Sequence, residues 1–292
     1  IANRGVIAIR ALRAARELGY SVASVYSTID RDQKHLKLSD EAICIGPPET
    51  KDSYLNEAAI ISAAELSGAD AIYPGFGFLA ENASFAEKCR ESGFKFIGPD
   101  PEVIAIMGDK IKAKELAKSL NIPVVPGYEG EISTENEAIK IVEEIGYPVI
   151  IKASAGGGGR GMRVVNSSDE LWQSIQSAQN EAELAFGDGK IFIEKYLKKP
   201  RHIEVQIFGN GKGEAVHLFT RDCSLQRKYQ KIVEEAPALN IDNQKLEEIQ
   251  NLSVEACKKL NYEGAGTIEF LYENNDFYFI EMNTRIQVEH TV

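Results

Sequence analysis

The sequence predicts a mixed α/β and α+β protein, in which a doubly wound parallel-sheet domain precedes a small α+β unit and an antiparallel-sheet region. Three observations predict this class. Strand and helix patterns alternate over residues 1–98, a glycine-rich segment lies between two strand patterns after Lys152, and two hairpin patterns occupy the last third of the chain. Hydrophobic residues make up 43% of the 292 residues, enough for packed cores in more than one domain.

The composition excludes several classes of protein. The formal net charge of −11 argues against a chain that wraps nucleic acid, so any phosphate site must be a local basic pocket. No apolar run has the length of a membrane helix, and no signal peptide heads the chain. The four cysteines lack zinc-like spacing, and we expect reduced, mostly buried thiols in a cytoplasmic protein. The chain opens inside a strand pattern without methionine, and we expect a fragment that lacks both native ends.

Residues 1–98 are predicted to form the N-terminal α/β domain. Helices are expected at Val6–Leu18 and Ala83–Ser92, and a strand at Val22–Tyr26. Ligands of doubly wound sheets bind beyond the carboxyl ends of the strands, where Gly75–Asn82 (GFGFLAEN) would lie. On its own, this glycine-containing segment is better explained as a tight turn.

Residues 99–122 are predicted to form a helical linker. Lys110 begins the second helix of this linker, where a positive charge opposes the helix dipole. The residue is therefore either placed for a ligand or simply solvated.

Residues 123–197 are predicted to form a small lid subdomain. Strands are expected at Pro148–Lys152 and Lys190–Lys195, with a glycine-rich loop that contains Gly157, Gly158 and Gly159 after the first. A Walker-type loop needs its lysine after the glycines and a helix beyond, and neither is present here. A strand–loop–strand unit instead suits a mobile flap over a nucleotide, with a flexible hairpin tip as the alternative.

Residues 198–292 are predicted to form an incomplete antiparallel-sheet subdomain. In its first hairpin, alternation places His202, Glu204 and Gln206 on one face. A basic cluster at 226–231 indicates either an anion site or a solvated turn.

The second hairpin predicts a metal site. If Asn274, Asn275 and Asp276 form a three-residue loop, Glu269 lies opposite Glu281. Like charges directly opposed on a sheet are destabilising, and a divalent cation would offset the repulsion. With Asn283 nearby the ligands are all oxygen atoms, which suits magnesium, whereas two unrelated solvated glutamates are the alternative. Polar residues continue at alternate positions after this hairpin, which indicates a catalytic face at Asn283, Arg285, Gln287 and Glu289.

In this order the parts resemble an ATP-grasp enzyme, and more closely the biotin carboxylase family. The resemblance covers nearly the whole chain and rests on these motifs: GFGFLAEN (75–82), MGDK (107–110), KASAGGGGRGMRVV (152–165), EKYLKKPRHIEVQIFG (194–209), KIVEEAP (231–237) and EMNTRIQVEH (281–290).

The resemblance implies a role for each matching residue. Phosphate and nucleotide contacts fall to Lys110, Lys152, the glycine loop, Glu194, Lys195, Leu197, His202, Glu204 and Gln226. Magnesium (or manganese) ligands are Glu269, Glu281 and Asn283. Bicarbonate contacts are Lys231, Arg285, Gln287 and Val288, and Glu289 is the general base.

The resemblance further implies a ligase that uses ATP and bicarbonate to form carboxyphosphate and then carboxylates biotin on a biotin carboxyl carrier protein. This is the first half-reaction of acetyl-CoA carboxylase in fatty acid biosynthesis, with carboxyltransferase as a further partner and a homodimer as the full-length assembly. The family continues past Val292 with an arginine that handles biotin, so we expect this chain to bind MgATP but to turn over biotin poorly. Another ATP-grasp carboxylate–amine ligase, and a truncated nucleotide-binding module without turnover, are the alternatives.

Overall fold

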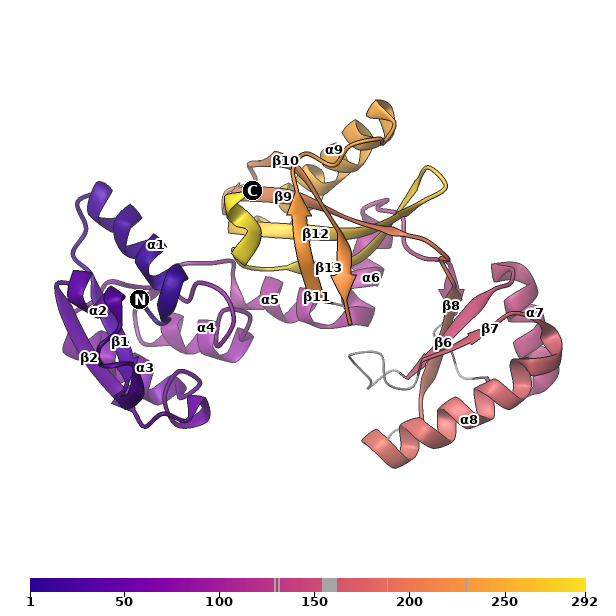
Figure 1. The fold of residues 1–292 in the computed structure, drawn as a ribbon, viewed down its shortest axis with the longest axis horizontal. Coiled ribbons are helices and arrows are strands. Elements are labelled where there is room, and N and C mark those ends of the chain that lie inside the picture. The colour runs from indigo at the N-terminus through magenta and orange to yellow at the C-terminus, as the bar shows by residue number, and fades with distance from the viewer. Residues whose placement is uncertain (129, 131, 154–161, 188, 229) are drawn as a thin grey trace.

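A computed structural model of the chain describes residues 1–292 except 129, 131, 154–161, 188 and 229. The described elements form three lobes in a row (Figure 1). The N-terminal residues lie in the lobe at the left, a large antiparallel sheet occupies the centre, and a smaller sheet with two long helices forms the lobe at the right. The C-terminus ends beside the central sheet.

The N-terminal lobe is built from short parallel strand pairs, as the alternating pattern predicts. The pairs are β1 (Ala23–Ser27) with β2 (Glu41–Gly46) and β3 (Ala71–Ile72) with β4 (Lys95–Phe96). The helices are α1 (Gly5–Glu17), α2 (Lys34–Leu38), α3 (Glu57–Leu66) and α4 (Ala83–Glu91). The first residues of the chain join the two pairs, since the amide of Ala2 donates to the carbonyl of Tyr73 at 2.8 Å and that of Val25 donates to Ile1 at 3.3 Å.

Two linker helices connect this lobe to the central sheet. They are α5 (Pro101–Gly108) and α6 (Lys110–Ser119). The carboxylate of Asp109 caps α6 by accepting from the amides of Ile111 and Lys112 at 3.0 and 3.2 Å. The apolar sides of both helices pack into the core of the central sheet.

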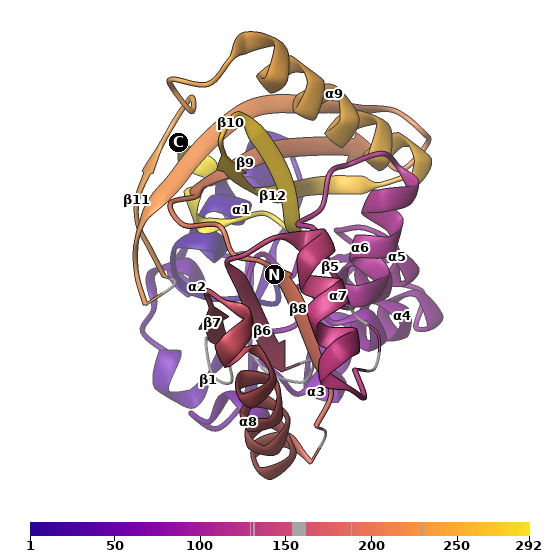
Figure 2. The ribbon, with the colours of Figure 1, turned by 90° about the vertical axis from the view of Figure 1, so that its right-hand side faces the viewer.

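The lid lobe is a four-stranded antiparallel sheet in the order β5-β8-β6-β7, with α7 and α8 packed against it (Figure 2). Its elements are β5 (Gly127–Tyr128), α7 (Glu135–Ile145), β6 (Val149–Ala153), β7 (Arg163–Val165), α8 (Ser168–Phe186) and β8 (Ile191–Lys195). Strands lie on both sides of the glycine-rich segment, as expected for a flap. Gly157, Gly158 and Gly159 themselves lie outside the described residues.

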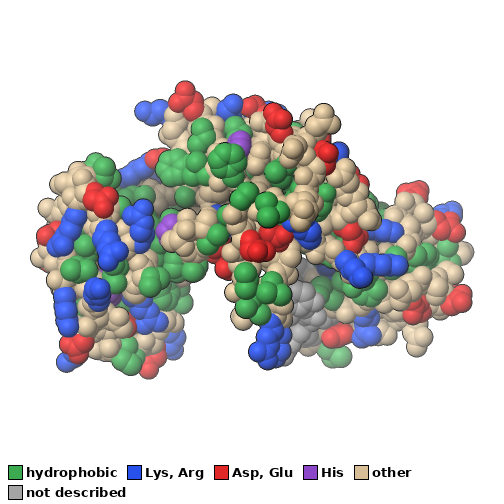
Figure 3. Space-filling view, turned by 45° about the horizontal axis from the view of Figure 1, so that its top comes forward, with side chains coloured by type: hydrophobic (Ala, Val, Ile, Leu, Met, Phe, Trp, Pro, Cys, Tyr) green, Lys and Arg blue, Asp and Glu red, His purple; other side chains and the backbone are tan. Residues whose placement is uncertain are grey.

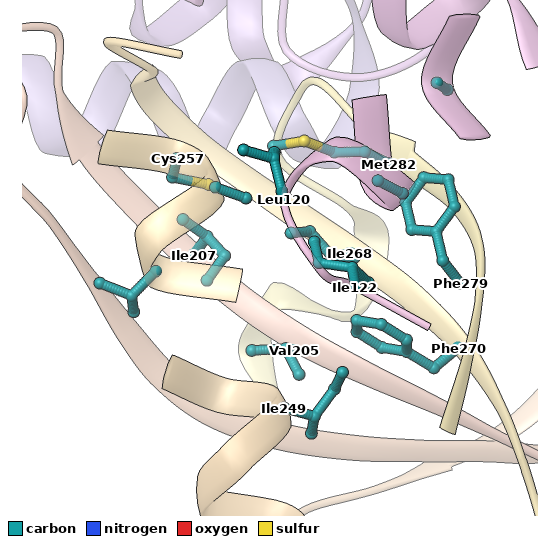
Figure 4. Close-up of a cluster of buried hydrophobic side chains, with 14 of the residues drawn as sticks. Leu120, Ile122, Val205, Ile207, Ile249, Cys257, Ile268, Phe270, Phe279 and Met282 are labelled. Atoms are coloured by element: carbon teal, nitrogen blue, oxygen red, sulfur yellow. The ribbon is translucent and has the colours of Figure 1, made fainter. Parts of the chain in front are cut away.

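The central sheet has the order β11-β10-β9-β12-β13 and buries one face against α9, α5 and α6 (Figure 4). Its elements are β9 (Arg201–Asn210), β10 (Ala215–Arg227), β11 (Gln230–Glu235), α9 (Asn243–Lys259), β12 (Glu263–Glu273) and β13 (Asp276–Asn283). Ile203, Val205 and Ile207 on β9 are fully buried in this core, so the residues between them face the other side, as the alternation predicts.

The predicted three-residue loop of the last hairpin is wrong, although the predicted pairing of Glu269 with Glu281 is confirmed. The turn has two residues, Asn274 and Asn275, both with left-handed backbones at φ of 54° and 69°. Asparagine tolerates this conformation, and two such residues match the twist of a hairpin. A bulge on β13 skips Ile280 and restores the register beyond it.

Candidate active site

Three glutamates lie side by side across the face of the central sheet that is turned away from its hydrophobic core. Glu204 on β9 is opposite Glu269 on β12, which is opposite Glu281 on β13. Glu204 is fully buried and Glu269 is 5% exposed, so both charges need partners within the protein. The strand order therefore concentrates negative charge at one place on the sheet.

Lys231 on β11 is the shared partner of three carboxylates. Its ammonium group contacts Glu204, and lies 3.0 Å from Glu269 Oε1 and 2.9 Å from Glu289 Oε1. Burial alone would lower the pKa of Lys231, but the charges of Glu269 and Glu204 raise it well above its usual range. Lys231 is therefore a permanent cation.

Glu269 is the best-satisfied carboxylate of the row. Its Oε1 accepts from Asn283 Nδ2 at 2.7 Å, from Gln287 Nε2 at 3.0 Å and from Lys231. Its Oε2 lies 2.9 Å from Nε2 of His202. Burial alone would raise the pKa of Glu269, but His202 and Lys231 outweigh burial and lower it to about 2. Glu269 is therefore ionised at neutral pH.

Glu281 is the unsatisfied member of the row. It is half-buried, and no hydrogen bond or ion pair of its carboxylate occurs among the described residues. Burial and the charge of Glu269 raise its pKa, with the charge of Lys110 acting in the opposite direction. Such uncompensated negative charge beside Glu269 and Asn283 fits a hard divalent cation with oxygen ligands.

A second set of possible ligands is already engaged. Ligand atoms of His202, Glu204 and Glu269 lie within 4.8 Å of one another. The ammonium group of Lys231 pairs with both of these glutamates, so the Glu281 side of Glu269 has the stronger case for a metal.

The segment after β13 carries the remaining polar groups. Arg285 donates from Nε to Glu81 Oε2 at 2.7 Å and from a terminal nitrogen to Asn283 Oδ1 at 2.8 Å. Glu81 comes from the N-terminal lobe and ties that lobe to the site. Burial would raise the pKa of Glu289, but the hydrogen bond from Lys231 outweighs it and lowers the pKa, so that Glu289 can accept a proton.

A second buried cluster lies on the lid. Glu194 on β8 sits between Lys152 on β6 and Lys114 on α6, and pairs with both. Burial alone would raise the pKa of Glu194, but the two lysines lower it. The next residue turns the other way, because Lys195 donates to the carbonyls of Gly146 and Tyr147 at 2.8 and 2.9 Å.

The structure brings together most of the residues singled out from the sequence. One contact network joins Lys231, His202, Glu204, Gln226, Gln287, Glu289, Glu269, Asn283 and Arg285, with Glu281 paired in register beside it. Gln226 reaches this network through His202, whose Nδ1 lies 2.9 Å from the amide nitrogen of Gln226. Lys152 and Glu194 belong to the lid cluster. Lys110 is exposed at the start of α6, and Leu197 is half-buried after β8. Val288, at the start of the short helix Val288–Thr291, is 60% exposed, so its side chain lies largely in solvent.

Gln206 was predicted only to share a face with His202 and Glu204, and it accepts from Arg221. The residues of the two clusters that were not predicted as site residues are Glu81, Lys114, Arg221 and Thr267. Two of them carried a usable signal. Lys114 lies four positions after Lys110 on one helix face, and Thr267 shares the alternation of Glu269.

Two hollows of the molecule lie away from this chemistry. One, of about 230 Å³, is lined by Pro123, Ile249 and Phe277, and the other, of about 630 Å³, by Lys195, Lys199 and Tyr272. Neither is lined by the row of glutamates, so we place the candidate site by its charge network. The space-filling view shows a further hollow between the N-terminal lobe and the centre of the molecule (Figure 3).

Among the described residues, no helix combines the length and the apolar character that a membrane crossing requires.

Comparisons with known proteins place the chain in a defined context. Residues 1–104 match the family model "Biotin carboxylase, N-terminal domain", and residues 109–292 match "Carbamoyl-phosphate synthase L chain, ATP binding domain". The chain is 56% identical over 293 residues to the biotin carboxylase of Pseudomonas aeruginosa, covering 100% of this chain and 65% of that protein. It is 51% identical to a pyruvate carboxylase subunit of Methanothermobacter thermautotrophicus, covering 100% and 60%.

Solved structures agree. A biotin carboxylase complex from Campylobacter jejuni superimposes with a TM-score of 0.88 at 51% identity, covering 99% of this chain and 65% of that chain. The biotin carboxylase domain of a thermophilic 2-oxoglutarate carboxylase, bound to bicarbonate, gives 0.93 at 46% identity, covering 100% and 64%. The chain thus spans about 65% of the length of the first curated relatives that it matches.

Proposed function

The chain belongs to the biotin carboxylase family, and from this premise we propose that it carries the nucleotide, metal and bicarbonate sites of an ATP-dependent ligase that carboxylates biotin. The observation that supports this most strongly is the placement of Lys231 among Glu204, Glu269 and Glu289, beside the facing pair Glu269 and Glu281. This network combines a permanent cation, an ionised base and an unsatisfied carboxylate, which are the groups that such a reaction needs.

The oxygen atoms of Glu269, Glu281 and Asn283 would hold magnesium or manganese. Bound there, the ion would neutralise charge on the phosphate oxygens of ATP during transfer. The residues fit the ion, because the carboxylate of Glu281 lacks a partner among the described residues and its pKa is raised by burial and by Glu269.

The nucleotide would lie between the lid and the central sheet. Lys110 and Lys152 would contact its phosphates, with Glu194, Leu197 and the backbone of Lys195 at the adenine, and His202, Glu204 and Gln226 lining the site. The side chain of Lys195 is turned to the carbonyls of Gly146 and Tyr147, so a contact through its main chain is the one we propose. Gly157, Gly158 and Gly159 would close over the phosphates.

Bicarbonate would be held by Lys231, Arg285, Gln287 and the backbone of Val288. Glu289, ionised beside Lys231, would remove the proton of bicarbonate. The bicarbonate oxygen would attack the γ-phosphorus of ATP, releasing ADP and forming carboxyphosphate. Carboxyphosphate would break down to phosphate and carbon dioxide, which carboxylates N1 of biotin.

We assign the whole protein to the first half-reaction of a biotin-dependent carboxylase, with a biotin carboxyl carrier protein and carboxyltransferase as partners, in a cytoplasmic homodimer. Acetyl-CoA carboxylase of fatty acid biosynthesis is the assignment that we favour. Relatives of comparable identity carry the names of biotin carboxylase, of pyruvate carboxylase and, in Glycine max, of methylcrotonoyl-CoA carboxylase. The acceptor of the carboxyl group is thus a property of the partner enzyme.

The test is ATP hydrolysis with and without bicarbonate and free biotin. We expect bicarbonate-dependent ADP formation that is abolished by Glu281→Gln and reduced roughly 10²–10⁴-fold by Glu289→Gln. Glu247→Gln, exposed on α9, is the matched control and should retain full activity. Stimulation by an amine instead of bicarbonate would favour a carboxylate–amine ligase, and MgATP binding without turnover would favour a nucleotide-binding module.

A further inference from the structure

Arg221 is a buried cation to which the proposed mechanism gives no task. It lies on β10 opposite Glu204 on β9, and only 3% of it is exposed. A guanidinium group at this depth is costly unless its donors are satisfied and its charge is paired. The structure satisfies it with side chains of the candidate active site rather than with a separate acidic partner.

The contacts of Arg221 reach three parts of the sheet face. Nε and one terminal nitrogen both lie 3.2 Å from Glu204 Oε2, and the other terminal nitrogen donates to Gln206 Oε1 at 2.8 Å. The first terminal nitrogen also donates to Gln287 Oε1 at 2.6 Å and to Thr267 Oγ1 at 3.3 Å. One rigid fork therefore links β9, β12 and the segment after β13.

The contact with Gln287 fixes the direction of its amide. Because the oxygen of Gln287 accepts from Arg221, its nitrogen faces Glu269 and donates to Oε1 at 3.0 Å. The reversed amide would set an oxygen against the Glu269 carboxylate and an NH₂ group against the guanidinium group. Both contacts would be repulsive, so Arg221 determines that Gln287 supports Glu269.

Arg221 also gives the two carboxylate oxygens of Glu204 different partners. Oε2 faces the guanidinium group, which leaves Oε1 to contact Lys231. Arg221 and Lys231 thus face the three carboxylates of Glu204, Glu269 and Glu289, and Glu281 adds a fourth beside them. Carboxylates that outnumber these two cations suit a divalent cation at this end of the site.

We infer that Arg221 is a positioning residue for the metal end of this site. It acts through Gln287 and Glu204, and among the described contacts it bonds to none of the proposed metal ligands Glu269, Glu281 and Asn283. The inference rests on the proposed function, because it takes Glu269, Glu281 and Asn283 as the metal ligands.

The test is a double-mutant cycle read by the affinity of Mn²⁺ in the presence of ADP. Arg221→Lys keeps the charge but loses the fork, and Gln287→Ala removes the amide that the fork directs. We expect each change to weaken Mn²⁺ about tenfold, which corresponds to about 1.4 kcal/mol. The double variant should bind no more than about twofold more weakly than the weaker single variant, because both changes remove the same support of Glu269.

Arg201→Lys is the matched control. Arg201 lies on β9 of the same sheet and pairs with Asp222 at 2.7 Å, outside the carboxylate row, so Mn²⁺ affinity should stay within about twofold of wild type. Unchanged affinity in Arg221→Lys, or two effects that multiply in the double variant, would overturn the inference. If Arg221→Lys does not fold, Gln287→Ala carries the test alone, and unchanged Mn²⁺ affinity in that variant overturns it. Absence of Mn²⁺ and ADP binding in the wild-type chain would instead overturn the proposed function together with this inference.

Discussion

Two clusters of buried charge have opposite arrangements. We call them the lid cluster (Glu194, Lys114 and Lys152) and the sheet cluster (Lys231, Glu204, Glu269 and Glu289). On the lid, one carboxylate, Glu194, is shared by two ammonium groups, those of Lys114 and Lys152. On the central sheet, one ammonium group, that of Lys231, is shared by three carboxylates. The central charge is thus negative on the lid and positive on the central sheet, and in each cluster it is paired with charges of the other sign.

The residue types around each central charge indicate what each cluster can bind. Lysines beside a glycine-rich segment suit phosphate, whereas several carboxylates with further oxygen ligands suit a divalent cation. MgATP carries both complements in one ligand. The comparison therefore explains why the lid and the sheet would need to face one another around a single substrate.

The largest expected effect on this comparison comes from removing the central charge of the sheet cluster. Lys231→Met leaves Glu204, Glu269 and Glu289 without their shared cation. Removing one partner of a buried ion pair typically costs about 3–5 kcal/mol, and we expect the free energy of unfolding to fall by that amount at pH 7. Urea denaturation followed by circular dichroism would measure it.

The control for this change is Lys245→Met. Lys245 is 40% exposed on α9 and pairs with Glu248 at 3.5 Å, so we expect a loss below about 0.5 kcal/mol. Equal losses in the two variants would show that Lys231 is not the centre of the cluster.

The pH dependence of stability gives the second largest effect. The folded pKa of Glu269 is about 2, below its ordinary value of 4.5. Its contribution is thus fully present above pH 4.5 and is lost as the pH falls toward 2, in total about 3 kcal/mol. Thermal melting of wild type and Glu269→Gln between pH 7 and pH 2 would measure this difference. The two profiles should converge in acid, and parallel profiles would contradict the assigned pKa.

A smaller loss is expected on the lid. Glu194→Gln keeps the shape of the side chain but removes the charge between Lys114 and Lys152, and should lower the free energy of unfolding by roughly 1–3 kcal/mol. Urea denaturation with Glu181→Gln as control would measure it, since Glu181 pairs with Arg163 at the surface and its loss should cost under about 0.5 kcal/mol. If Glu194→Gln lowers the free energy of unfolding no more than Glu181→Gln does, the charge of Glu194 does not stabilise the lid cluster.

Local sequence pattern was sufficient to predict which residues share a face of a strand, and insufficient to predict the contacts between distant segments. Alternation along single strands predicts that His202, Glu204 and Gln206 share a face and that Glu269 meets Glu281, and both are observed. The fold class and the family could likewise be predicted, since helix and strand patterns and motifs are local properties.

The contacts that complete the site depend on which strands become neighbours. Arg221 meets Gln287 because β10, β9 and β12 lie in that order, and Arg285 meets Glu81 across 204 residues of sequence. No periodicity encodes either contact. The bulge at Ile280 was missed for a similar reason, because a two-residue asparagine turn and a bulge together produce the same pairing of Glu269 that a three-residue loop would.

The smallest expected effect is also the sharpest, because it reverses sign with the ligand. Glu281→Gln removes a carboxylate that lies opposite Glu269 without a partner among the described residues. Relief of this repulsion should stabilise the metal-free chain by about 0.2–1 kcal/mol at pH 7. Thermal melting with and without Mn²⁺ and ADP would measure the stability of the ligand-free and the ligand-bound chain, with Glu247→Gln as control.

With Mn²⁺ and ADP present, wild type should gain stability by mass action and Glu281→Gln should gain little. The pKa of Glu281 is raised by burial and by Glu269, so its charged form opposes folding. That penalty applies above the raised pKa and disappears as the pH falls below the ordinary value of 4.5, so the advantage of Glu281→Gln should shrink in acid. A variant less stable than wild type without metal would mean that the carboxylate has a structural partner. The carboxylate of Glu281 would then not be available to a cation.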